Sequence, residues 1–302
     1  MMTMMPTRTT VHIHSGDSAA QTAATRLAGN HLSYSDLLMV GPIPSLADTG
    51  LEQFLERRSE VLHEELSVEG YSQQGIYCKI TGELQAIRDA LKLADAVFLW
   101  YDHCLFDQQL LHFMLTACLQ AYTIPMYLVP CPMDCLGFGE LTAEELSRCQ
   151  QQARLLAQTA VAESVSTIWP AFTSSDKEEL IRLSQMTCES FPDTPAAAQR
   201  LLDELPKSHN GLNTLEFNIL GAVLDGRSQF VDIFKAVSAK ERYPFFGDTY
   251  VRKRIEVLSG GACPLLRIHA NGCITATLEG ARTLWGWGHW RHPRYVANLR
   301  VD

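Results

Sequence analysis

Apolar residues in the first half of the chain occur either as short continuous runs or as longer stretches with a helical period. Residues 96–101 are continuously apolar or aromatic, which is typical of a buried strand. Residues 51–66 repeat apolar side chains every three or four positions and form an amphipathic helix pattern. Strands that alternate with helices favour a parallel sheet with helices on both faces. We therefore predict an α/β fold with an N-terminal, mostly parallel sheet and flanking helices.

The same patterns divide the first half into elements. Strands are predicted over 9–14, 32–34, 96–101 and 124–129, and helices over 19–27, 51–66, 82–93 and 105–121. From about residue 139 the pattern turns helical, with helices over 142–158, 175–190 and 195–205 and no convincing strand. Thr142 with Glu145, and Ser175 with Glu178, have the capping-box spacing that begins helices.

The second half ends in a smaller predicted domain. Residues 206–211 read as a linker, and helices over 214–224, 228–239 and 249–259 follow. Two strands, over 264–269 and 273–278, are joined by Ala270-Asn271-Gly272, a strong hairpin signal. Three helices and a hairpin predict a winged-helix-like domain. The predicted organisation is an α/β domain over 9–135, a helical connector over 139–206, the winged-helix-like domain over 212–285 and a Trp- and Arg-rich tail over 286–302.

Composition narrows the class of protein. The 302-residue chain has no apolar run long enough to span a membrane, and residues 1–10 lack the apolar stretch of a signal peptide, so we expect a cytoplasmic protein without membrane partners. The nine cysteines are scattered, which favours reduced thiols over a disulfide framework. Cys131 and Cys135 do not have the spacing of a redox pair and are predicted to lie in a loop.

Charge is distributed unevenly along the chain. Residues 240–302 contain ten Lys and Arg and five Asp and Glu, a net charge of +5, whereas the remainder carries 15 − 29 = −14, which together give the total of −9. Any contact with a polyanion is therefore expected near the C-terminal end. Uneven surface charge without a partner is the alternative.

A group of polar residues follows the strand predicted over 96–101. Trp100 lies near the end of the apolar run, Asp102 and His103 follow it, and Asp107 and Gln108 lie in the first turn of the next predicted helix. Open α/β sheets bind ligands at the carboxyl ends of their strands, so these residues form the candidate site. An imidazole beside carboxylates can act as a general base or bind a metal.

One histidine with two acids is a small ligand set, so no metal site is predicted unless His12 or His14 joins it. The structural alternative has Asp107 stabilising the first turn of the helix and His103 as a hydrogen-bonded residue of the junction.

Two further segments could bind an anion. The turn from His14 to Ser18 joins a strand to a helix, and Gly16 allows close backbone approach while Asp17 or Ser18 could cap the helix. Arg57 and Arg58 could hold a phosphate or carboxylate, although such a pair is more often the polar face of a helix. In the winged-helix-like domain, the basic residues of its third helix could contact DNA phosphates: Arg252, Lys253 and Arg254.

These motifs resemble a bacterial family known as domain of unknown function 1835. The resemblance covers roughly residues 11–132 and rests on Gly16-Asp17-Ser18, on Asp36 followed by Gly41-Pro42-Ile43-Pro44, on Arg57-Arg58, and on the block from Trp100 through His103 to Asp107-Gln108. Cys104 departs from the acid that often follows the histidine in that family. Residues 212–287 are similar to its companion, domain of unknown function 3658, through Leu215-Glu216, Phe246-Gly247-Asp248 and Thr277-Leu278-Glu279-Gly280. Neither resemblance implies a reaction.

The leading hypothesis is a site for a small anionic ligand, such as a nucleotide or phosphorylated metabolite, at the carboxyl edge of the sheet. If the protein is an enzyme, a transferase or hydrolase is expected, with catalytic residues His103, Asp102 and Asp107. The expected ligand-binding residues are His14, Gly16, Asp17, Ser18, Asp36, Gly41, Arg57, Arg58, Trp100 and Gln108. A ligand-responsive regulator that binds DNA and a non-catalytic adaptor are the alternatives. The cofactor and the oligomeric state stay open.

Overall fold

The computed structural model describes residues 9–301. No signal peptide is expected in residues 1–10, and most of that segment, residues 1–8, lies outside the described residues. None of the described helices is both long and apolar enough to cross a membrane.

A five-stranded sheet forms the centre of the N-terminal domain, in the order β2–β1–β3–β4–β5. The strands β1 (Thr9–His14), β2 (Asn30–Ser33), β3 (Ala94–Trp100) and β4 (Met126–Leu128) are parallel, as predicted. The fifth strand, β5 (Arg154–Leu155), pairs antiparallel with β4. It lies where the sequence pattern predicts a continuous helix over 142–158. The helix there, α5 (Ala143–Gln151), ends early, and the chain pairs with the open edge of β4 instead.

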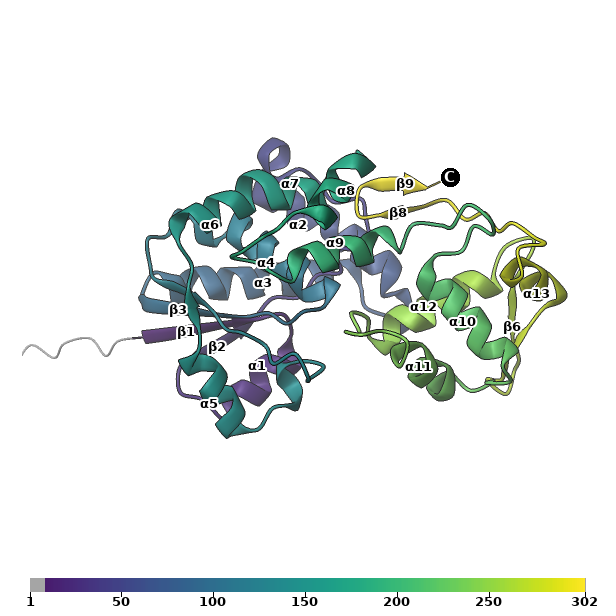
Figure 1. The fold of residues 1–302 in the computed structure, drawn as a ribbon, viewed down its shortest axis with the longest axis horizontal. Helices are drawn as coiled ribbons and strands as arrows, with labels where there is room; N and C mark the ends of the chain where they lie inside the picture. The colour runs from purple at the N-terminus through teal and green to yellow at the C-terminus, as the bar shows by residue number, and fades with distance from the viewer. Residues whose placement is uncertain (1–8, 302) are drawn as a thin grey trace, which may run out of the picture.

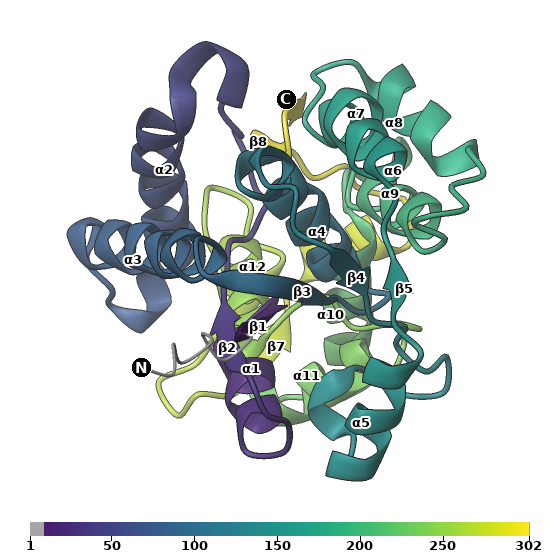
Figure 2. The same ribbon diagram turned by 90° about the vertical axis from the view of Figure 1, so that its left-hand side faces the viewer.

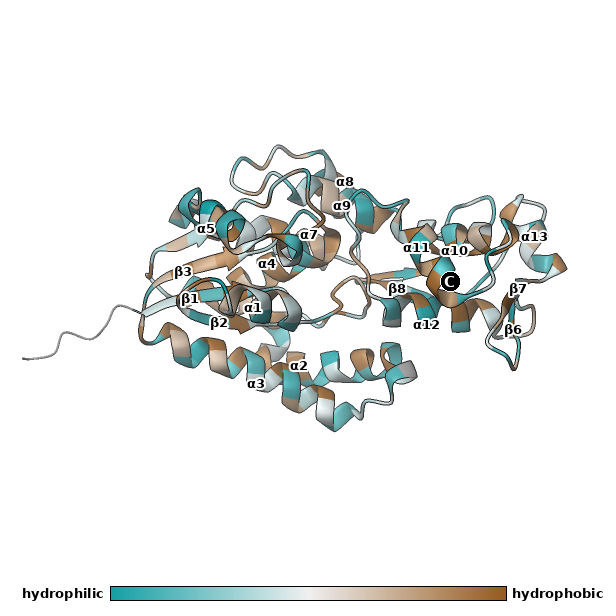
Figure 3. Ribbon diagram, turned by 90° about the horizontal axis from the view of Figure 1, so that it is seen from below, coloured by the Kyte–Doolittle hydropathy of each residue, from teal (hydrophilic) through white to brown (hydrophobic). Residues whose placement is uncertain are grey.

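Helices cover both faces of this sheet. In Figure 2, α1 (Asp17–Ala24) and α5 lie on one face, and α2 (Leu46–Glu65), α3 (Gln73–Leu91) and α4 (Leu105–Ala117) lie on the other. Strand residues alternate between the two: Ile13 and Leu99 belong to the larger core, and Trp100 belongs to a smaller cluster with residues of the β4–α5 segment. Figure 3 shows hydrophilic and hydrophobic residues alternating along α2 and α3, as expected of helices with one buried face.

The middle of the chain continues the core of the N-terminal domain. Helices α6 (Gln158–Glu163), α7 (Trp169–Phe172), α8 (Lys177–Gln185) and α9 (Thr194–Leu202) follow β5, with a π-helical turn over Ser164–Ile168 between α6 and α7. Both α9 and the π-helical turn pack against α4. The capping box of Thr142 and Glu145 forms as predicted. The prediction for α8 was wrong by one residue, because Asp176 rather than Ser175 caps it and accepts from the Glu178 amide.

The C-terminal domain contains the predicted helices and hairpin. They are α10 (Thr214–Leu224), α11 (Phe230–Ser238), α12 (Asp248–Ser259), and the antiparallel pair β6 (Leu266–Ile268) and β7 (Ile274–Ala276). A further helix, α13 (Leu278–Leu284), follows the hairpin. The classification of this domain as a winged helix stays a prediction.

The tail, in which the sequence shows no regular period, forms a second hairpin. Its strands β8 (Arg294–Val296) and β9 (Leu299–Val301) leave the C-terminal domain and dock on the loop that follows β2 (Figure 1). Val296 pairs with Val40, and the Ala297 amide donates to the Met39 carbonyl at 2.8 Å. The side chain of Asn298 bonds both backbone groups of Ile43. The hairpin therefore fastens one domain to the other.

Candidate functional site

The carboxyl ends of β1 and β3 meet at one edge of the sheet, which faces the C-terminal domain (Figure 1). β1 lies between β2 and β3, so the chain reverses its winding direction between these strands. Ligands of open α/β sheets bind at such a switch point. His14 and Trp100 are register partners at the ends of the two strands, and Asp102 follows two residues later. The location predicted from the sequence is therefore a true sheet edge, adjacent to the second domain.

The polar residues after β3 mostly bond to one another. An Asp107 carboxylate oxygen accepts from the Asp102 amide at 2.7 Å, and an Asp102 carboxylate oxygen accepts from the Cys104 amide at 2.9 Å. The Gln108 side chain donates to the Asp102 carbonyl at 2.7 Å. These bonds join the end of β3 to the first turn of α4. The arrangement supports the structural alternative for Asp107, as a residue that stabilises the start of the helix.

The two acids hold protons more tightly than ordinary carboxyl groups. Burial raises the pKa of Asp107 well above its usual range, and the neighbouring Asp102 charge adds to the effect. Burial also raises the pKa of Asp102. Asp102, Cys104 and Asp107 could each offer one atom to a metal ion, and these three atoms lie within 4.8 Å of one another. However, both carboxylates already accept backbone N–H groups of the junction between β3 and α4, and this use of their oxygens does not need a metal.

His103 does not lie between the two acids. Its Nδ1 is 3.0 Å from a carboxylate oxygen of Asp193, in an ion-pair contact without the alignment of a hydrogen bond. This contact raises the pKa of His103, although partial burial opposes it. The ring packs against Tyr243, with centroids 4.7 Å apart, and contacts the Pro132 carbonyl. His103 therefore joins β3 to α9 and to the C-terminal domain.

A buried polar chain extends from this junction into the core. The Gln108 side-chain oxygen accepts from the Thr194 hydroxyl at 3.1 Å, and Thr194 bonds His112 at 2.8 Å. The other ring nitrogen of His112 is 2.7 Å from the Ser164 hydroxyl. Burial lowers the pKa of His112 to about 3, so its imidazole is neutral near pH 7. This chain fixes the positions of Gln108 and of the first turn of α9.

In the turn after β1, Asp17 has side-chain partners, whereas the start of α1 has no side-chain cap. Gly16 caps α1 with extended backbone and without a side-chain bond, so Ser18 does not have the predicted capping role. Asp17 accepts from Ser33 at 2.6 Å and pairs with Lys79 at 2.9 Å. These partners, Ser33 foremost, lower the pKa of Asp17. The turn lies at the same sheet edge, but its acid is paired with α3 instead of facing the residues after β3.

His14 and Trp100 belong to the interior beneath α1. His14 bonds His31 at 3.1 Å, and the Trp100 indole donates to His12 at 3.0 Å. Burial, reinforced by the neighbouring histidines, lowers the pKa of His14 to about 3, and burial lowers that of His12 to about 4. These side chains are neutral core residues. Among residues 9–301, no histidine lies close enough to Asp102 and Asp107 to share a metal ion with them.

Asp36 and Gly41 lie in the loop that receives the tail hairpin, and Arg58 on α2 bonds to this loop. Arg58 and Asp36 form an ion pair at 2.7 Å in which both side chains are fully buried. Arg58 also donates to the carbonyls of residues 37, 40 and 42. A Cβ on Gly41 would lie 1.5 Å from the Ala297 carbonyl, so the hairpin needs a glycine there. Asp36 and Arg58 thus have structural roles, Gly41 has one and also lines a pocket, and exposed Arg57 pairs only with Glu60 among the described residues.

Two of the three basic residues of α12 face the N-terminal domain. Arg254 donates to both carboxylate oxygens of Glu65, at 2.7 and 2.9 Å. Lys253 donates to the Ser67 hydroxyl at 3.0 Å, and Arg252 stacks on Phe230. The helix expected to contact DNA therefore has two of its three basic side chains occupied at the domain interface. This arrangement counts against DNA binding through α12.

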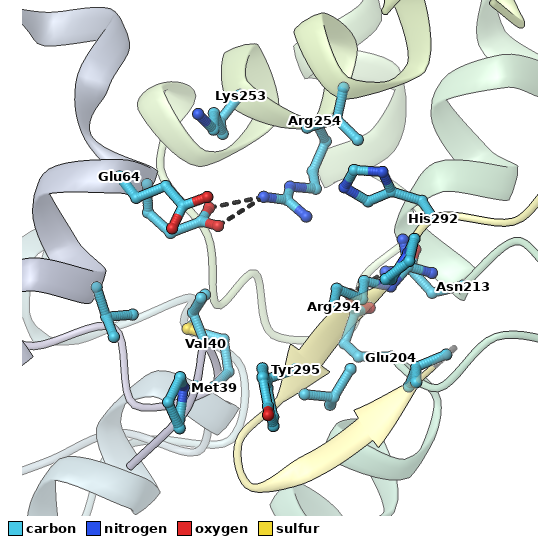
Figure 4. A pocket seen from close by; sticks show the side chains of 18 of the residues that line it. Met39, Val40, Glu64, Glu204, Asn213, Lys253, Arg254, His292, Arg294 and Tyr295 are labelled. Carbon is cyan, nitrogen blue, oxygen red and sulfur yellow. Dashed lines mark hydrogen bonds and ion pairs between the residues drawn. The ribbon is translucent and has the colours of Figure 1, made fainter. Parts of the chain in front are cut away.

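A pocket of about 700 Å³ lies between the two domains (Figure 4). Its walls come from the loop after β2, the end of α2, α12 and the tail hairpin. The polar and aromatic lining residues are Glu64, Glu65, Glu204, Asn213, Tyr250, Lys253, Arg254, His292, Arg294, Tyr295 and Arg300. Its size matches the clefts that hold small-molecule ligands. Two walls contain residues singled out in the sequence: Gly41 in the loop after β2, expected to bind the ligand, and Lys253 and Arg254 on α12, expected to contact DNA phosphates.

Two buried guanidinium groups line this pocket. Arg254 is 6% exposed, and its Nε has no hydrogen-bond partner among residues 9–301. Arg294 pairs with the fully buried Glu216 through both terminal nitrogens, and its Nε also lacks a partner within the described chain. Figure 4 shows Arg254 and His292 directed toward the open space. Burial, with the charges of Arg294 and Arg254, lowers the pKa of His292, which favours a neutral imidazole.

Sequence reasoning missed several of these residues. His292, Arg294 and Tyr295 lie in a segment without a period, and Asp193 and Tyr243 reach His103 from distant positions. The excess of positive charge after residue 240, with the basic residues predicted on the helix over 249–259, was the signal that pointed toward this side of the pocket.

The chain was also compared with known proteins. No protein-family model and no curated protein matches it, so the resemblance to the two families of unknown function stays a prediction.

Proposed function

We propose that the protein binds a small anionic ligand in the pocket between its two domains. The observation that carries the proposal is Arg254, a buried guanidinium in the pocket wall with an unpartnered Nε. A buried N–H without an acceptor is costly, and a phosphate or carboxylate oxygen would satisfy it with a charge-assisted bond. The ligand class is the one expected from the sequence, but its binding residues lie mainly in the C-terminal half.

The charges around the pocket support an anion of modest size. Glu65 pairs with Arg254, and Glu204 pairs with Arg200 at 2.7 Å outside the pocket lining. Lys253 adds a further positive charge to the wall, and its ammonium group donates to a neutral hydroxyl, that of Ser67. Glu64 lies on the opposite side and limits the net positive charge (Figure 4). A single phosphate or carboxylate group fits this balance better than a polyanion does.

A thermal-shift screen tests the proposal. The purified protein is titrated with inorganic phosphate, a nucleoside monophosphate and a dicarboxylate, and binding is then measured by calorimetry. A compound that binds only the folded state, at about 100 times its Kd, should add about 2.7 kcal/mol of stability. Arg254→Ala should weaken binding at least about tenfold, because a hydrogen bond to a charged group contributes about 1.5–3 kcal/mol. Arg254→Lys keeps the charge and tests the requirement for a guanidinium if the alanine variant is unstable.

Arg252→Ala is the matched control. It removes the same charge from the same helix, but Arg252 stacks on Phe230 and does not line the pocket. Binding should be unchanged in this variant. Equal losses in the Arg252 and Arg254 variants would show a general charge effect and contradict the proposal. The absence of any stabilising anion, with the protein folded, would contradict it as well.

A further inference from the structure

The loop after β4 brings two cysteine thiols into contact. The sulfur atoms of Cys131 and Cys135 lie 3.5 Å apart. Cys131 is buried in the smaller apolar cluster, and Cys135 is half-buried at its margin. The spacing between them is one residue longer than that of the common redox pair, so the sequence argues against a redox role. The fold nevertheless places the two sulfurs at van der Waals distance.

The backbone between these cysteines contacts both His103 and the C-terminal domain. The Pro132 carbonyl lies 3.4 Å from the His103 ring and also accepts from the Cys135 thiol at 3.2 Å. The Met133 carbonyl accepts from the Tyr243 hydroxyl at 3.5 Å. Any change that tightens the loop between the two cysteines therefore acts on groups that contact the domain interface.

We propose that Cys131 and Cys135 form a dithiol site that exchanges with low-molecular-weight disulfides such as oxidised glutathione. A disulfide requires a sulfur–sulfur distance of about 2.05 Å, so closure needs an approach of about 1.5 Å. Side-chain rotation and a small movement of the loop can supply that approach, because the loop has no regular secondary structure. This proposal is independent of ligand binding in the interdomain pocket.

The exchange proceeds in two balanced steps. The thiolate of the more accessible Cys135 attacks one sulfur of oxidised glutathione, forms a mixed disulfide and releases one glutathione thiolate. The Cys131 sulfur then attacks the Cys135 sulfur, loses its proton to solvent and releases the second glutathione thiolate. Two electrons pass from the protein thiols to glutathione. Burial, followed by the adjacent Cys135, raises the pKa of Cys131 and lowers its thiolate fraction, so Cys135 reacts first. Cys131 then attacks a sulfur that is already in contact with it.

Redox buffers test the proposal through its stoichiometry. The full-length protein is equilibrated with reduced and oxidised glutathione, the thiols are blocked, and the products are identified by intact mass and peptide mapping. We expect a loss of about 2 Da that maps to a Cys131–Cys135 link. Dilution of both glutathione forms by about twofold, at a constant ratio, should raise the disulfide-to-dithiol ratio about twofold, because two thiols leave for each disulfide consumed. A mixed disulfide at one cysteine would not respond to this dilution.

Variants separate the pair from the other thiols. Cys131→Ser and Cys135→Ser should each abolish the intramolecular link, whereas Cys263→Ser, at an exposed thiol, should leave it unchanged. If Cys131 and Cys135 stay reduced in buffers that glutathionylate exposed Cys78 and Cys263, the proposal is overturned. A link from Cys131 to any other cysteine would overturn it too.

Discussion

At the scale of single residues, buried side chains in this protein are held in one charge state by their surroundings. Arg58 and Asp36 are charged and satisfy each other within the core. His12 and His14 are neutral and lie in the apolar cluster beneath α1 and α5, where protonation would place an uncompensated charge. The fold thus buries one pair of ionisable groups in the charged form, as an ion pair, and two histidines in the neutral form.

The neutral histidines predict a loss of stability in acid. The folded pKa values, about 4 for His12 and about 3 for His14, lie below the ordinary histidine pKa of 6.5. The unfolded state therefore binds protons first, and stability falls as the pH drops below about 6.5 toward the folded values. Each histidine contributes up to about 1.4 kcal/mol per pH unit in that range. Urea denaturation between pH 7 and pH 4 measures this slope.

His14→Leu isolates the effect from that of the carboxyl groups. The variant loses the bond to His31 and should be less stable at pH 7, but its stability should fall less steeply in acid than that of the wild type. Equal slopes for the two proteins would show that His14 does not take part in the acid transition.

At the scale of the elements, the tail hairpin depends on a close backbone approach. Gly41→Ala would place a Cβ against the Ala297 carbonyl, so β8 and β9 must shift from the loop after β2. We expect a loss of about 1–3 kcal/mol, as for other overpacked sites, and faster hydrogen exchange over 294–301. Gly139→Ala is the control, because a Cβ there meets no atom within 4 Å. If both variants exchange at the wild-type rate over 294–301, the close contact does not hold the hairpin.

Elements with complete local signals were predicted accurately from the sequence. α10 has the predicted bounds. Asn213 and Glu216 form a capping box at its first turn, and both residues lie within four positions of each other in the sequence. The tail hairpin was missed because its stability comes from the distant loop 39–43, not from its own pattern. The segment that forms α6 and α7 was missed because a π-helical turn interrupts its period. The candidate site divides in the same way: the sheet edge was predictable, whereas the partners of His103 depend on the tertiary fold.

At the scale of the whole molecule, the two domains are joined by polar contacts across their interface. Arg200 on α9 pairs with Glu241 at 2.7 Å, and Arg254 pairs with Glu65 at 2.7 Å. Asn298 adds a bond to the Thr173 carbonyl at 2.6 Å to those it makes with Ile43. Because most of these groups are buried or half-buried, loosening one contact leaves polar atoms without partners. The domains are therefore expected to unfold as one cooperative unit.

Asn298→Ala tests this cooperativity. The variant leaves the Ile43 amide and the Ile43 and Thr173 carbonyls without their side-chain partner, at a cost of about 1–3 kcal/mol. Hydrogen exchange in rising urea, followed by mass spectrometry, should show the wild type losing protection in both domains together. In the variant the C-terminal domain should lose protection first. Separate transitions already in the wild type would show that the domains are not coupled.

The docking of the tail also has a consequence for synthesis on the ribosome. Asn298 bonds Ile43 across 255 positions, and residues 292–301 supply one wall of the interdomain pocket. Translation is vectorial, so the sheet and its helices emerge and can fold well before this wall exists. Gly41 in the loop after β2 stays uncovered until β8 and β9 have been synthesised. A nascent chain can thus carry a folded N-terminal domain and still lack the enclosed pocket, so a ligand can stabilise the protein only after residues 292–301 have been added.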